Sequence, residues 1–429
     1  MKTPRRRLLR SAVAAGLAVQ QGPAIRTGAI TANNGGVALS AEEQVSRGLP
    51  TVSSSDPFRL VGARSRPLES LVEVPLSLCG GAYCITYTID NQPFRAVVDT
   101  GSPFLLVEGA RPDGTCGQAA NAQRWGCYKG AARGTGLPDT DELFGGEDVG
   151  VQWRQGAFAL RNASSGGGLA IDDAIFGRIN SYEGKGGGGA VFLGFAKRRL
   201  PRIRPTLLEQ TGVAALRFDF PGRRMQLSPV PLIGWREDAL RLIDLRPRGT
   251  PIANYACRVE RLVVNGCLVP LDRPCVAVID TGTTGLSVSE DLYDSGILPV
   301  PVREAQIEMR TERGGVAVLE ASVRRRRRPY PGVPTIEQPL SAEEYEEFPL
   351  VVSPVPVPWF EPGFGEACAD GEPFQCDGTP IGTRRSYLST LLQRVDGLGE
   401  KPHVLFVGAA FLWPRQITID VDACRMLIV

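Results

Sequence analysis

The sequence contains a single histidine, His403, among 429 residues. This scarcity excludes zinc sites that need two histidines and disfavours Ser-His or Cys-His nucleophilic catalysis. His403 itself stands in Lys-Pro-His and is interpreted as a structural or surface residue. No Cys-x-x-Cys spacing occurs among the 10 cysteines, which favours disulfides in an oxidising compartment over zinc binding. We therefore expect neither a metal nor another cofactor.

The sequence also lacks a strong charge imbalance and a long apolar run. The formal net charge of +2 does not favour nucleic acid as a partner. The apolar segment after MKTPRRRLLR, about nine residues, is too short and too polar to span a bilayer. Glycine runs at 166–168 and 186–189 precede no Lys-Ser/Thr pair, so they are expected to be surface loops rather than phosphate cradles.

What the sequence does contain is an Asp-Thr-Gly motif in two copies. The first is VVDTGSPFLLV, residues 97–107, and the second is AVIDTGTTGLSV, residues 277–288. Each aspartate ends an apolar run that predicts a β-strand, and each is followed by Thr-Gly and a hydroxyl residue. Asp99 and Asp280 are 181 positions apart (280 − 99). One copy carries little information, whereas two in matching settings are hard to obtain by chance.

Two neighbouring carboxyl groups that share one proton can hydrolyse an amide, because one deprotonates a water while the other protonates the carbonyl oxygen. The glycines let two turns approach closely, and the threonine hydroxyls can bond the backbone of the opposing turn. The last residue of each motif can orient a carboxylate. The predicted site therefore consists of Asp99, Thr100, Gly101, Ser102, Asp280, Thr281, Gly282 and Thr283.

These motifs resemble those of the pepsin-like aspartic proteases, the two-lobed eukaryotic aspartyl proteases. VFLG (Val191 to Gly194) and LFVG (Leu405 to Gly408) resemble the strands that pass beside the catalytic turns in that family. The run FVGAAFLWPRQITIDVDACRMLIV resembles its closing segment of two short strands. The resemblance extends from about residue 70 to the C-terminus. It implies an all-β, bilobal fold with two pseudo-twofold-related, β-barrel-like lobes and a central cleft.

The resemblance implies an aspartic endopeptidase that cleaves extended polypeptides through a water held between Asp99 and Asp280. It implies a monomer with no metal, no nucleic-acid partner and no stable membrane span. The alternative is a catalytically weak or inactive pepsin-like protein that acts in binding or inhibition. A half-enzyme that must dimerise is disfavoured, because one chain already supplies both motifs.

The flap, a hairpin that closes over the dyad in this family, departs from the family pattern. A Tyr-Gly pair is usual at its tip, whereas the best match here is Phe144-Gly145, 45 positions after Asp99 (144 − 99). The usual tryptophan partner of that tyrosine, seven residues after the first aspartate, is replaced by Leu106. Because both polar partners are missing together, we expect a variant flap held by apolar contacts. The alternative is a misaligned loop.

The predicted organisation has five parts: a targeting presequence over 1–36, a pro-segment or linker over 37–69, an N-terminal lobe over 70–227, an interlobe connection over 228–251 and a C-terminal lobe over 252–429. An insertion is placed at about 305–375, where Arg324 to Arg328 are interpreted as a solvated surface balanced by SAEEYEE. The presequence favours the secretory pathway, the exterior or an organelle lumen, a plastid included, over the cytosol. A pro-segment would make the protein a zymogen.

Local signals predict further features. Turns are expected at Pro221-Gly222 and Asn265-Gly266, and a helix over 201–212. Cys116 with Cys127, and Cys368 with Cys376, are the expected disulfide pairs. The other six cysteines are unassigned, and free buried thiols are the alternative for several of them.

Overall fold

The computed structural model describes residues 68, 70–78, 82–111, 113–116, 125–144, 147–161, 167–183, 192–199, 204–246, 250, 252–283, 285–299, 302–322, 324–326, 345–348, 352–354 and 402–429. In this part of the chain strands far outnumber helices, which confirms the predicted all-β class. The predicted presequence, 1–36, and all but the edge of the segment 37–69 lie outside these residues. Among the described residues, none of the helices has the length and apolar character needed to cross a membrane.

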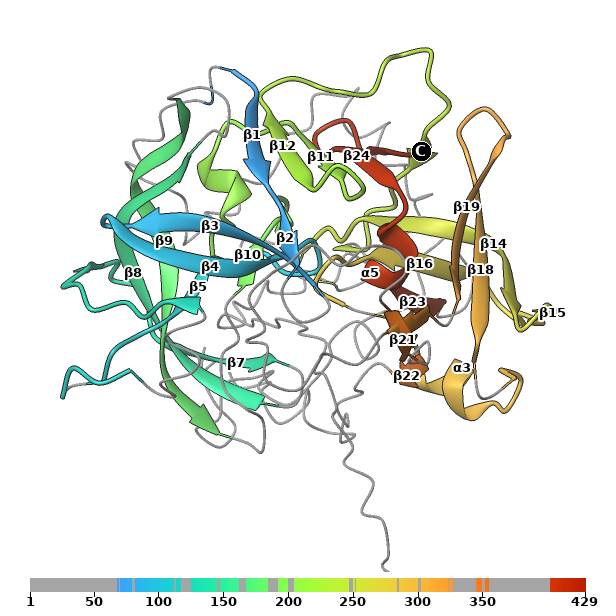
Figure 1. The fold of residues 1–429 in the computed structure, drawn as a ribbon, viewed down its shortest axis with the longest axis horizontal. Coiled ribbons are helices and arrows are strands. Elements are labelled where there is room, and N and C mark those ends of the chain that lie inside the picture. The colour runs from blue at the N-terminus through green and yellow to red at the C-terminus, as the bar shows by residue number, and fades with distance from the viewer. Residues whose placement is uncertain are drawn as a thin grey trace, which may run out of the picture.

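Nine strands from the first half of the chain form one sheet, with the path β10-β4-β3-β8-β9-β5 and three added strands (Figure 1). Its strands are β2 (Ser77–Leu78), β3 (Tyr83–Ile89), β4 (Gln92–Asp99), β5 (Leu106–Glu108), β6 (Arg133–Gly134), β7 (Thr140–Phe144), β8 (Glu147–Arg161), β9 (Gly168–Glu183) and β10 (Phe192–Gly194). The β3–β4 hairpin turns at Asp90 and Asn91, whose positive φ values of 49° and 63° suit a two-residue turn. This hairpin delivers Asp99 beside the parallel strand β10.

Eight strands from the second half form another sheet, with the path β19-β18-β14-β16-β23-β17-β22 and β15 paired to β14. Its strands are β14 (Ala256–Val264), β15 (Cys267–Leu268), β16 (Cys275–Ile279), β17 (Leu286–Val288), β18 (Glu304–Arg310), β19 (Val316–Ser322), β22 (Val352–Pro354) and β23 (His403–Val407). β16 is antiparallel to β14 and parallel to β23, which repeats the relation of β4 to β3 and β10. Every residue of β16 and β23 is buried, as expected for parallel strands covered on both faces.

A third sheet takes strands from both halves of the chain, in the order β1-β12-β11-β24-β25-β13. Its strands are β1 (Val72–Pro75), β11 (Ala215–Asp219), β12 (Arg224–Ser228), β13 (Leu240–Arg241), β24 (Gln416–Asp420) and β25 (Arg425–Ile428). β11 pairs with β24, so the middle of the chain is joined to its C-terminus, and in Figure 1 these two strands lie between the larger sheets. The two short strands predicted for the C-terminal run are confirmed.

The predicted turns at Pro221-Gly222 and Asn265-Gly266 are confirmed, since β11 pairs with β12 and β14 with β15 across them. The predicted helix over 201–212 is wrong for most of its described length. Only a 3₁₀ turn, η1 (Leu208–Gln210), forms there, and Thr211 is already extended. Pro205 accounts for the missing start, because it disfavours helical backbone in the residue before it. The extended backbone of Thr211 then ends the element after a single turn. The other helices within the described ranges are α3 (Glu290–Asp294) and α5 (Ala409–Leu412).

Cys116 and Cys127 form the predicted disulfide. Cys84 is disulfide-bonded as well. Among the described cysteines four are free, and the alternative of buried free thiols is confirmed for Cys257 and Cys275. Cys267 is free and exposed, and Cys424 is free and partly exposed. The predicted pair Cys368–Cys376 lies outside the described residues.

Within the predicted insertion, a separate two-stranded sheet pairs β20 (Arg324–Arg326) with β21 (Tyr345–Phe348). β21 belongs to the acidic stretch SAEEYEE and the residue that follows it. The backbone thus brings part of the arginine run next to the acidic segment that was expected to balance it.

Candidate active site

The two Asp-Thr-Gly turns leave equivalent strands of the two large sheets. Asp99 is the last residue of β4, and Asp280 directly follows β16. Each turn lies against the parallel neighbour of its strand. The Phe195 N–H donates to the Asp99 carbonyl at 2.8 Å, and the Asp280 N–H donates to the Val407 carbonyl at 3.0 Å. The predicted VFLG and LFVG strands, β10 and β23, are therefore confirmed in their places beside the turns.

Thr100 and Thr281 lock the two turns together by exchanging hydrogen bonds. The Thr100 hydroxyl donates to the Ile279 carbonyl at 2.7 Å and accepts from the Thr281 N–H at 3.1 Å. The Thr281 hydroxyl donates to the Val98 carbonyl at 2.6 Å and accepts from the Thr100 N–H at 3.1 Å. All four bonds are buried, so breaking any of them leaves polar groups without water as a substitute.

Gly101 and Gly282 allow each turn to approach the carboxyl group of the other. A Cβ atom on Gly101 would lie 2.7 Å from Asp280 Cγ, and one on Gly282 would lie 2.6 Å from Asp99 Oδ1. Contacts this short do not occur between a side-chain carbon and its neighbours, so a larger residue would push the carboxyl group aside. The structure thus brings the two aspartates together, and it explains on steric grounds why both positions are occupied by glycine.

Backbone donors within each turn hold the two carboxyl groups. Asp99 and Asp280 are fully buried, with 0% of their surface exposed. The Gly101 N–H donates to Asp99 Oδ1 at 2.8 Å, and the Gly282 N–H donates to Asp280 Oδ1 at 2.9 Å. One oxygen of each carboxyl group is therefore fixed by its own turn, and the second oxygen is left for the other carboxyl group, a hydroxyl or a substrate.

The hydroxyl residue that ends each motif makes the site asymmetric. The Thr283 hydroxyl donates to Asp280 Oδ2 at 2.8 Å, as predicted for a residue that orients the carboxylate. Ser102 is also buried, but among the described residues neither its Oγ nor Asp99 Oδ2 has a hydrogen-bond partner of good geometry. Asp280 is thus the better supplied with donors, whereas Asp99 Oδ2 is a buried oxygen that a proton would satisfy.

Burial raises the pKa of both carboxyl groups. For Asp99, burial is the largest cause. The charge of the neighbouring Asp280 and a hydrogen bond between the two carboxyl groups raise the pKa of Asp99 further, well above its usual range. The nearby Ser102 hydroxyl lowers this pKa and so opposes the rise. For Asp280, burial raises the pKa as well, but hydrogen bonds with Thr283 and Asp99 oppose it. The two groups titrate as a pair. Because both pKa values are raised, the pair keeps a proton at a pH where ordinary aspartates have lost theirs.

β7 and β8 form a hairpin at the position where the sequence predicts the flap. The pair Phe144↔Glu147 closes it across a two-residue connection. Phe144 is the last residue of β7, and its side chain is not described, while Gly145 lies outside the described residues. The hairpin is therefore confirmed, and the part that its tip plays stays a prediction.

Trp153 of β8, absent from the predicted site, braces this hairpin. Its indole N–H donates to the Thr140 hydroxyl, at the start of β7, at 3.0 Å. Its ring meets the Phe104 ring edge-on with centroids 5.2 Å apart, and Phe104 follows the first Asp-Thr-Gly turn. Leu106 is buried in the same apolar cluster. The sequence signal for this brace is the alternation Val-Gly-Val-Gln-Trp, which predicts that the tryptophan faces inward and needs a partner for its N–H.

Removing this brace should loosen the hairpin without unfolding the protein. Trp153→Phe keeps an aromatic ring but loses the N–H donor, and Thr140→Val loses the acceptor. For Thr140→Val the net loss of one hydrogen bond, about 1 kcal/mol, should speed local opening about fivefold. Trp153→Phe also shrinks a buried ring, so it should speed opening further. Amide hydrogen exchange over residues 140–161 measures this rate. Thr140→Ser keeps the hydroxyl and is the matched control. Exchange at the wild-type rate in both Trp153→Phe and Thr140→Val would show that the contact does not brace the hairpin.

His403 is a buried residue at the start of β23, with 3% of its surface exposed. Its Nε2 lies 2.7 Å from Asp272 Oδ1, and its backbone N–H donates to the Pro274 carbonyl at 2.8 Å. These contacts agree with the expected structural role, and they lie at the end of β23 away from the second Asp-Thr-Gly turn.

Searches against models of known protein families and against curated proteins find no match to the chain.

Proposed function

We propose that the chain is an aspartic endopeptidase of the pepsin-like, two-lobed kind. The observation that carries the proposal is the pair of buried carboxyl groups, Asp99 and Asp280, on equivalent turns locked together by Thr100 and Thr281. Close, buried carboxyl groups cannot both ionise easily, so the pair holds one proton and offers one acid and one base. Hydrolysis of an amide by water needs this combination.

In the proposed mechanism Asp280, the ionised member, accepts a proton from a water that attacks the scissile carbonyl carbon. Asp99 gives its proton to the carbonyl oxygen, and a gem-diol forms. The C–N bond then breaks as the amide nitrogen takes the proton from Asp280, while a diol hydroxyl returns a proton to Asp99. The products are a carboxylic acid and an amine, and the pair ends with the one proton it started with. No covalent bond to the enzyme forms.

The proposed substrate is a polypeptide in extended conformation, bound in a cleft between two pseudo-twofold-related lobes and covered by the β7–β8 hairpin. The two large sheets, one from each half of the chain, and the third sheet that joins them support this arrangement. A monomer is proposed because one chain supplies both aspartates. The Cys116–Cys127 disulfide supports an oxidising compartment, such as the secretory pathway or an organelle lumen.

The proposal is tested by cleavage of a denatured protein substrate across a range of pH. Because burial and Asp280 raise the pKa of Asp99, the shared proton is kept in mild acid and lost as the pH rises through that pKa. At still lower pH a second proton neutralises the base. We expect a bell-shaped profile with an acidic maximum, and inhibition by a statine-type transition-state mimic. An activity that rises toward alkaline pH and ignores the inhibitor would contradict the dyad mechanism.

The second candidate is a pepsin-like binding or inhibitory protein. Leu106, buried in an apolar cluster where the family has a polar partner for its flap, favours a less tightly closed hairpin. In that case the full chain should cleave nothing at any pH, although a statine-type compound could still raise its unfolding temperature. Sequencing the N-terminus after incubation in acid distinguishes this outcome from a zymogen that has not released residues 37–69.

A further inference from the structure

The segment that follows β10 holds both ends of the first Asp-Thr-Gly turn. The Phe195 N–H donates to the Asp99 carbonyl at 2.8 Å. The next residue, Ala196, donates its N–H to the Ser102 carbonyl at 3.1 Å. Among the described residues Asp99 Oδ2 has no hydrogen-bond partner of good geometry, whereas the Asp280 carboxyl group receives a hydroxyl from its own turn. The position of the Asp99 carboxyl group therefore depends on how firmly this backbone segment is held.

Tyr255, the residue before β14, connects this segment to the second Asp-Thr-Gly turn. The residue is buried, with 3% of its surface exposed, and its hydroxyl donates to the Phe195 carbonyl at 2.6 Å. Its own backbone carbonyl accepts from the Ile279 N–H at 2.9 Å, and Ile279 is the residue before Asp280. One tyrosine thus bonds to the segment behind the first turn through its side chain and to the strand that ends at the second turn through its main chain.

The Tyr255 hydroxyl also fixes the direction of a backbone donor. The Phe195 carbonyl and the Ala196 N–H belong to one planar peptide group, so a bond that holds the carbonyl also orients the N–H. That N–H is the donor to the Ser102 carbonyl. Burial raises the pKa of Tyr255 above its usual value, so the hydroxyl keeps its proton in acid and at neutral pH. The bond to Phe195 is therefore present over the whole range in which the dyad titrates.

The second half of the chain supplies the equivalent donor from a helix. Ala409 follows the LFVG run as Phe195 follows the VFLG run, and its N–H donates to the Thr283 carbonyl at 2.7 Å. The Ala409 carbonyl accepts from the Trp413 N–H at 2.9 Å, at the end of α5. Residues 195–199 form no helix, so the Phe195 carbonyl has no such backbone donor. The hydroxyl of Tyr255 takes its place.

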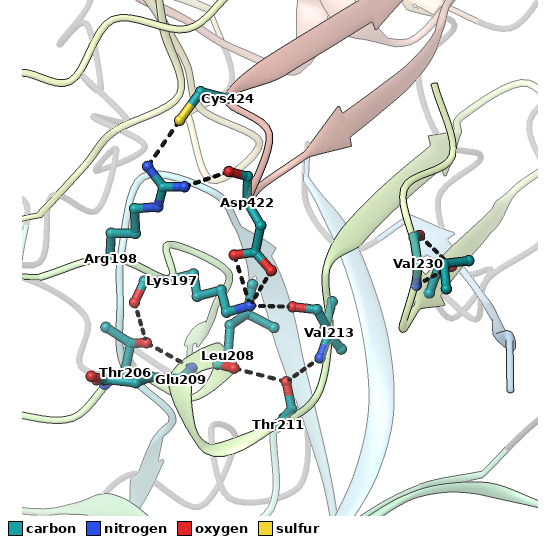
Figure 2. Close-up of polar contacts among 11 residues, drawn as sticks. Lys197, Arg198, Thr206, Leu208, Glu209, Thr211, Val213, Val230, Asp422 and Cys424 are labelled. Atoms are coloured by element: carbon teal, nitrogen blue, oxygen red, sulfur yellow. Dashed lines mark hydrogen bonds and ion pairs between the residues drawn. The ribbon is translucent and has the colours of Figure 1, made fainter. Parts of the chain in front are cut away.

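The next two residues fasten the same segment to the C-terminal hairpin (Figure 2). Lys197 Nζ binds the Asp422 carboxylate at 2.9 Å, and Arg198 Nη2 donates to the Asp422 backbone carbonyl at 2.7 Å. Asp422 lies in the turn between β24 and β25. The segment stays anchored at this end, so loss of the hydroxyl that reaches Phe195 would shift the stretch beside the first turn and not release the whole segment.

From these contacts we infer that Tyr255 is a positioning residue that fixes the spacing of Asp99 and Asp280. It acts through the backbone of Phe195 and Ile279, and it adds to the lock formed by the two motif threonines. Without its hydroxyl the first turn can move away from the second, and the repulsion that Asp280 exerts on the charge of Asp99 weakens. The inference rests on the proposed peptidase function for its effect on cleavage, whereas its effect on the titration of the pair does not depend on catalysis.

Tyr255→Phe tests the inference, because it removes one oxygen atom and keeps the ring. We expect kcat for cleavage of a fluorogenic peptide to fall about tenfold while KM changes less than about twofold, since a small displacement of a reacting group lowers the rate and not the affinity. The alkaline limb of the pH profile should move at least about half a unit to lower pH, because Asp99 loses part of the repulsion that raises its pKa.

Tyr83→Phe is the matched control. Tyr83 is also buried, and its hydroxyl donates to a backbone carbonyl, that of Phe220, at 3.5 Å. Its replacement should leave kcat and the alkaline limb as they are in the wild type. If Tyr255→Phe likewise keeps kcat within about twofold and does not move the limb, the inference is overturned.

Unfolding by urea across a range of pH decides the inference without catalysis. The free energy of unfolding of the wild type should fall as the pH rises from the pKa of an unfolded aspartate to the raised pKa of folded Asp99, and then level off. In Tyr255→Phe this fall should level off at a lower pH, whereas Tyr83→Phe should lower the whole curve by a constant amount. A constant shift in Tyr255→Phe as well would show that the hydroxyl is only structural. Absence of cleavage by the wild type would count against the proposed function alone.

Discussion

Asp99→Asn and Asp280→Asn are each expected to lower kcat for peptide cleavage by at least about 10³-fold, since each removes the acid or the base of the only proposed dyad. Asparagine keeps the size of the side chain and leaves the backbone bonds from Gly101 or Gly282 in place. The loss should appear in kcat rather than in KM, because the carboxyl groups act on the bond that breaks. Initial rates on a fluorogenic peptide at the pH of maximal activity measure both constants.

The matched control is Asp113→Asn. Asp113 is an exposed carboxyl group in a loop, where it accepts hydrogen bonds from Thr115 and not from the site. Its replacement should leave kcat unchanged. A wild-type kcat in Asp99→Asn would instead show that the aspartate pair does not carry out the cleavage.

Unfolding does not account for the expected loss of activity, because Asp99→Asn should stabilise the protein at neutral pH. An unfolded aspartate loses its proton near pH 3.9, whereas burial raises the pKa of folded Asp99. The folded state therefore binds more protons between the two values, and its stability falls as the pH rises through them. Asparagine has no proton to lose. The gain in unfolding temperature should be present at pH 7 and vanish near pH 3.

The parts of the site that the sequence predicts are those encoded by short patterns. Apolar runs that end in Asp-Thr-Gly place Asp99 and Asp280 at strand ends, and Asn265-Gly266 marks its hairpin because only a few residues tolerate two successive positive φ values. The strands β10 and β23 are predicted by resemblance, and their parallel pairing is found in the structure.

Contacts between distant segments are what the sequence does not predict. β11 pairs with β24 about 200 residues later, as in Arg217↔Thr418, and no local pattern encodes such a register. The Trp153–Thr140 hydrogen bond joins the two strands of a hairpin, so it can be predicted only when the pairing register of those strands is known. Among the described residues the Ser102 hydroxyl has no hydrogen-bond partner of good geometry, whereas the Thr283 hydroxyl donates to Asp280. Both occupy the same motif position, so the difference lies in the surroundings of each turn and not in the motif.

Thr100→Val should destabilise the protein more than an ordinary threonine substitution. Valine matches the shape of threonine, so the change isolates the hydroxyl, which donates to the Ile279 carbonyl and accepts from the Thr281 N–H. Losing both bonds in a buried place should lower the free energy of unfolding by about 2–4 kcal/mol. Denaturation by urea, followed by tryptophan fluorescence, measures the shift. Thr100→Ser keeps the hydroxyl, and Thr86→Val, on the exposed face of β3, should change stability by less than about 0.5 kcal/mol.

The double variant Thr100→Val with Thr281→Val tests whether the four bonds act as one lock. Once the first substitution lets the turns separate, the bonds of the second threonine are already weakened, so the double variant should lose less stability than the sum of the two singles. The same separation moves the carboxyl groups apart, and the pKa of Asp99 should fall back toward its usual value as the repulsion from Asp280 weakens. The alkaline limb of the pH profile should then shift to lower pH in any variant that retains activity. Additive losses and an unshifted limb would mean that other contacts, and not these hydroxyls, hold the two aspartates together.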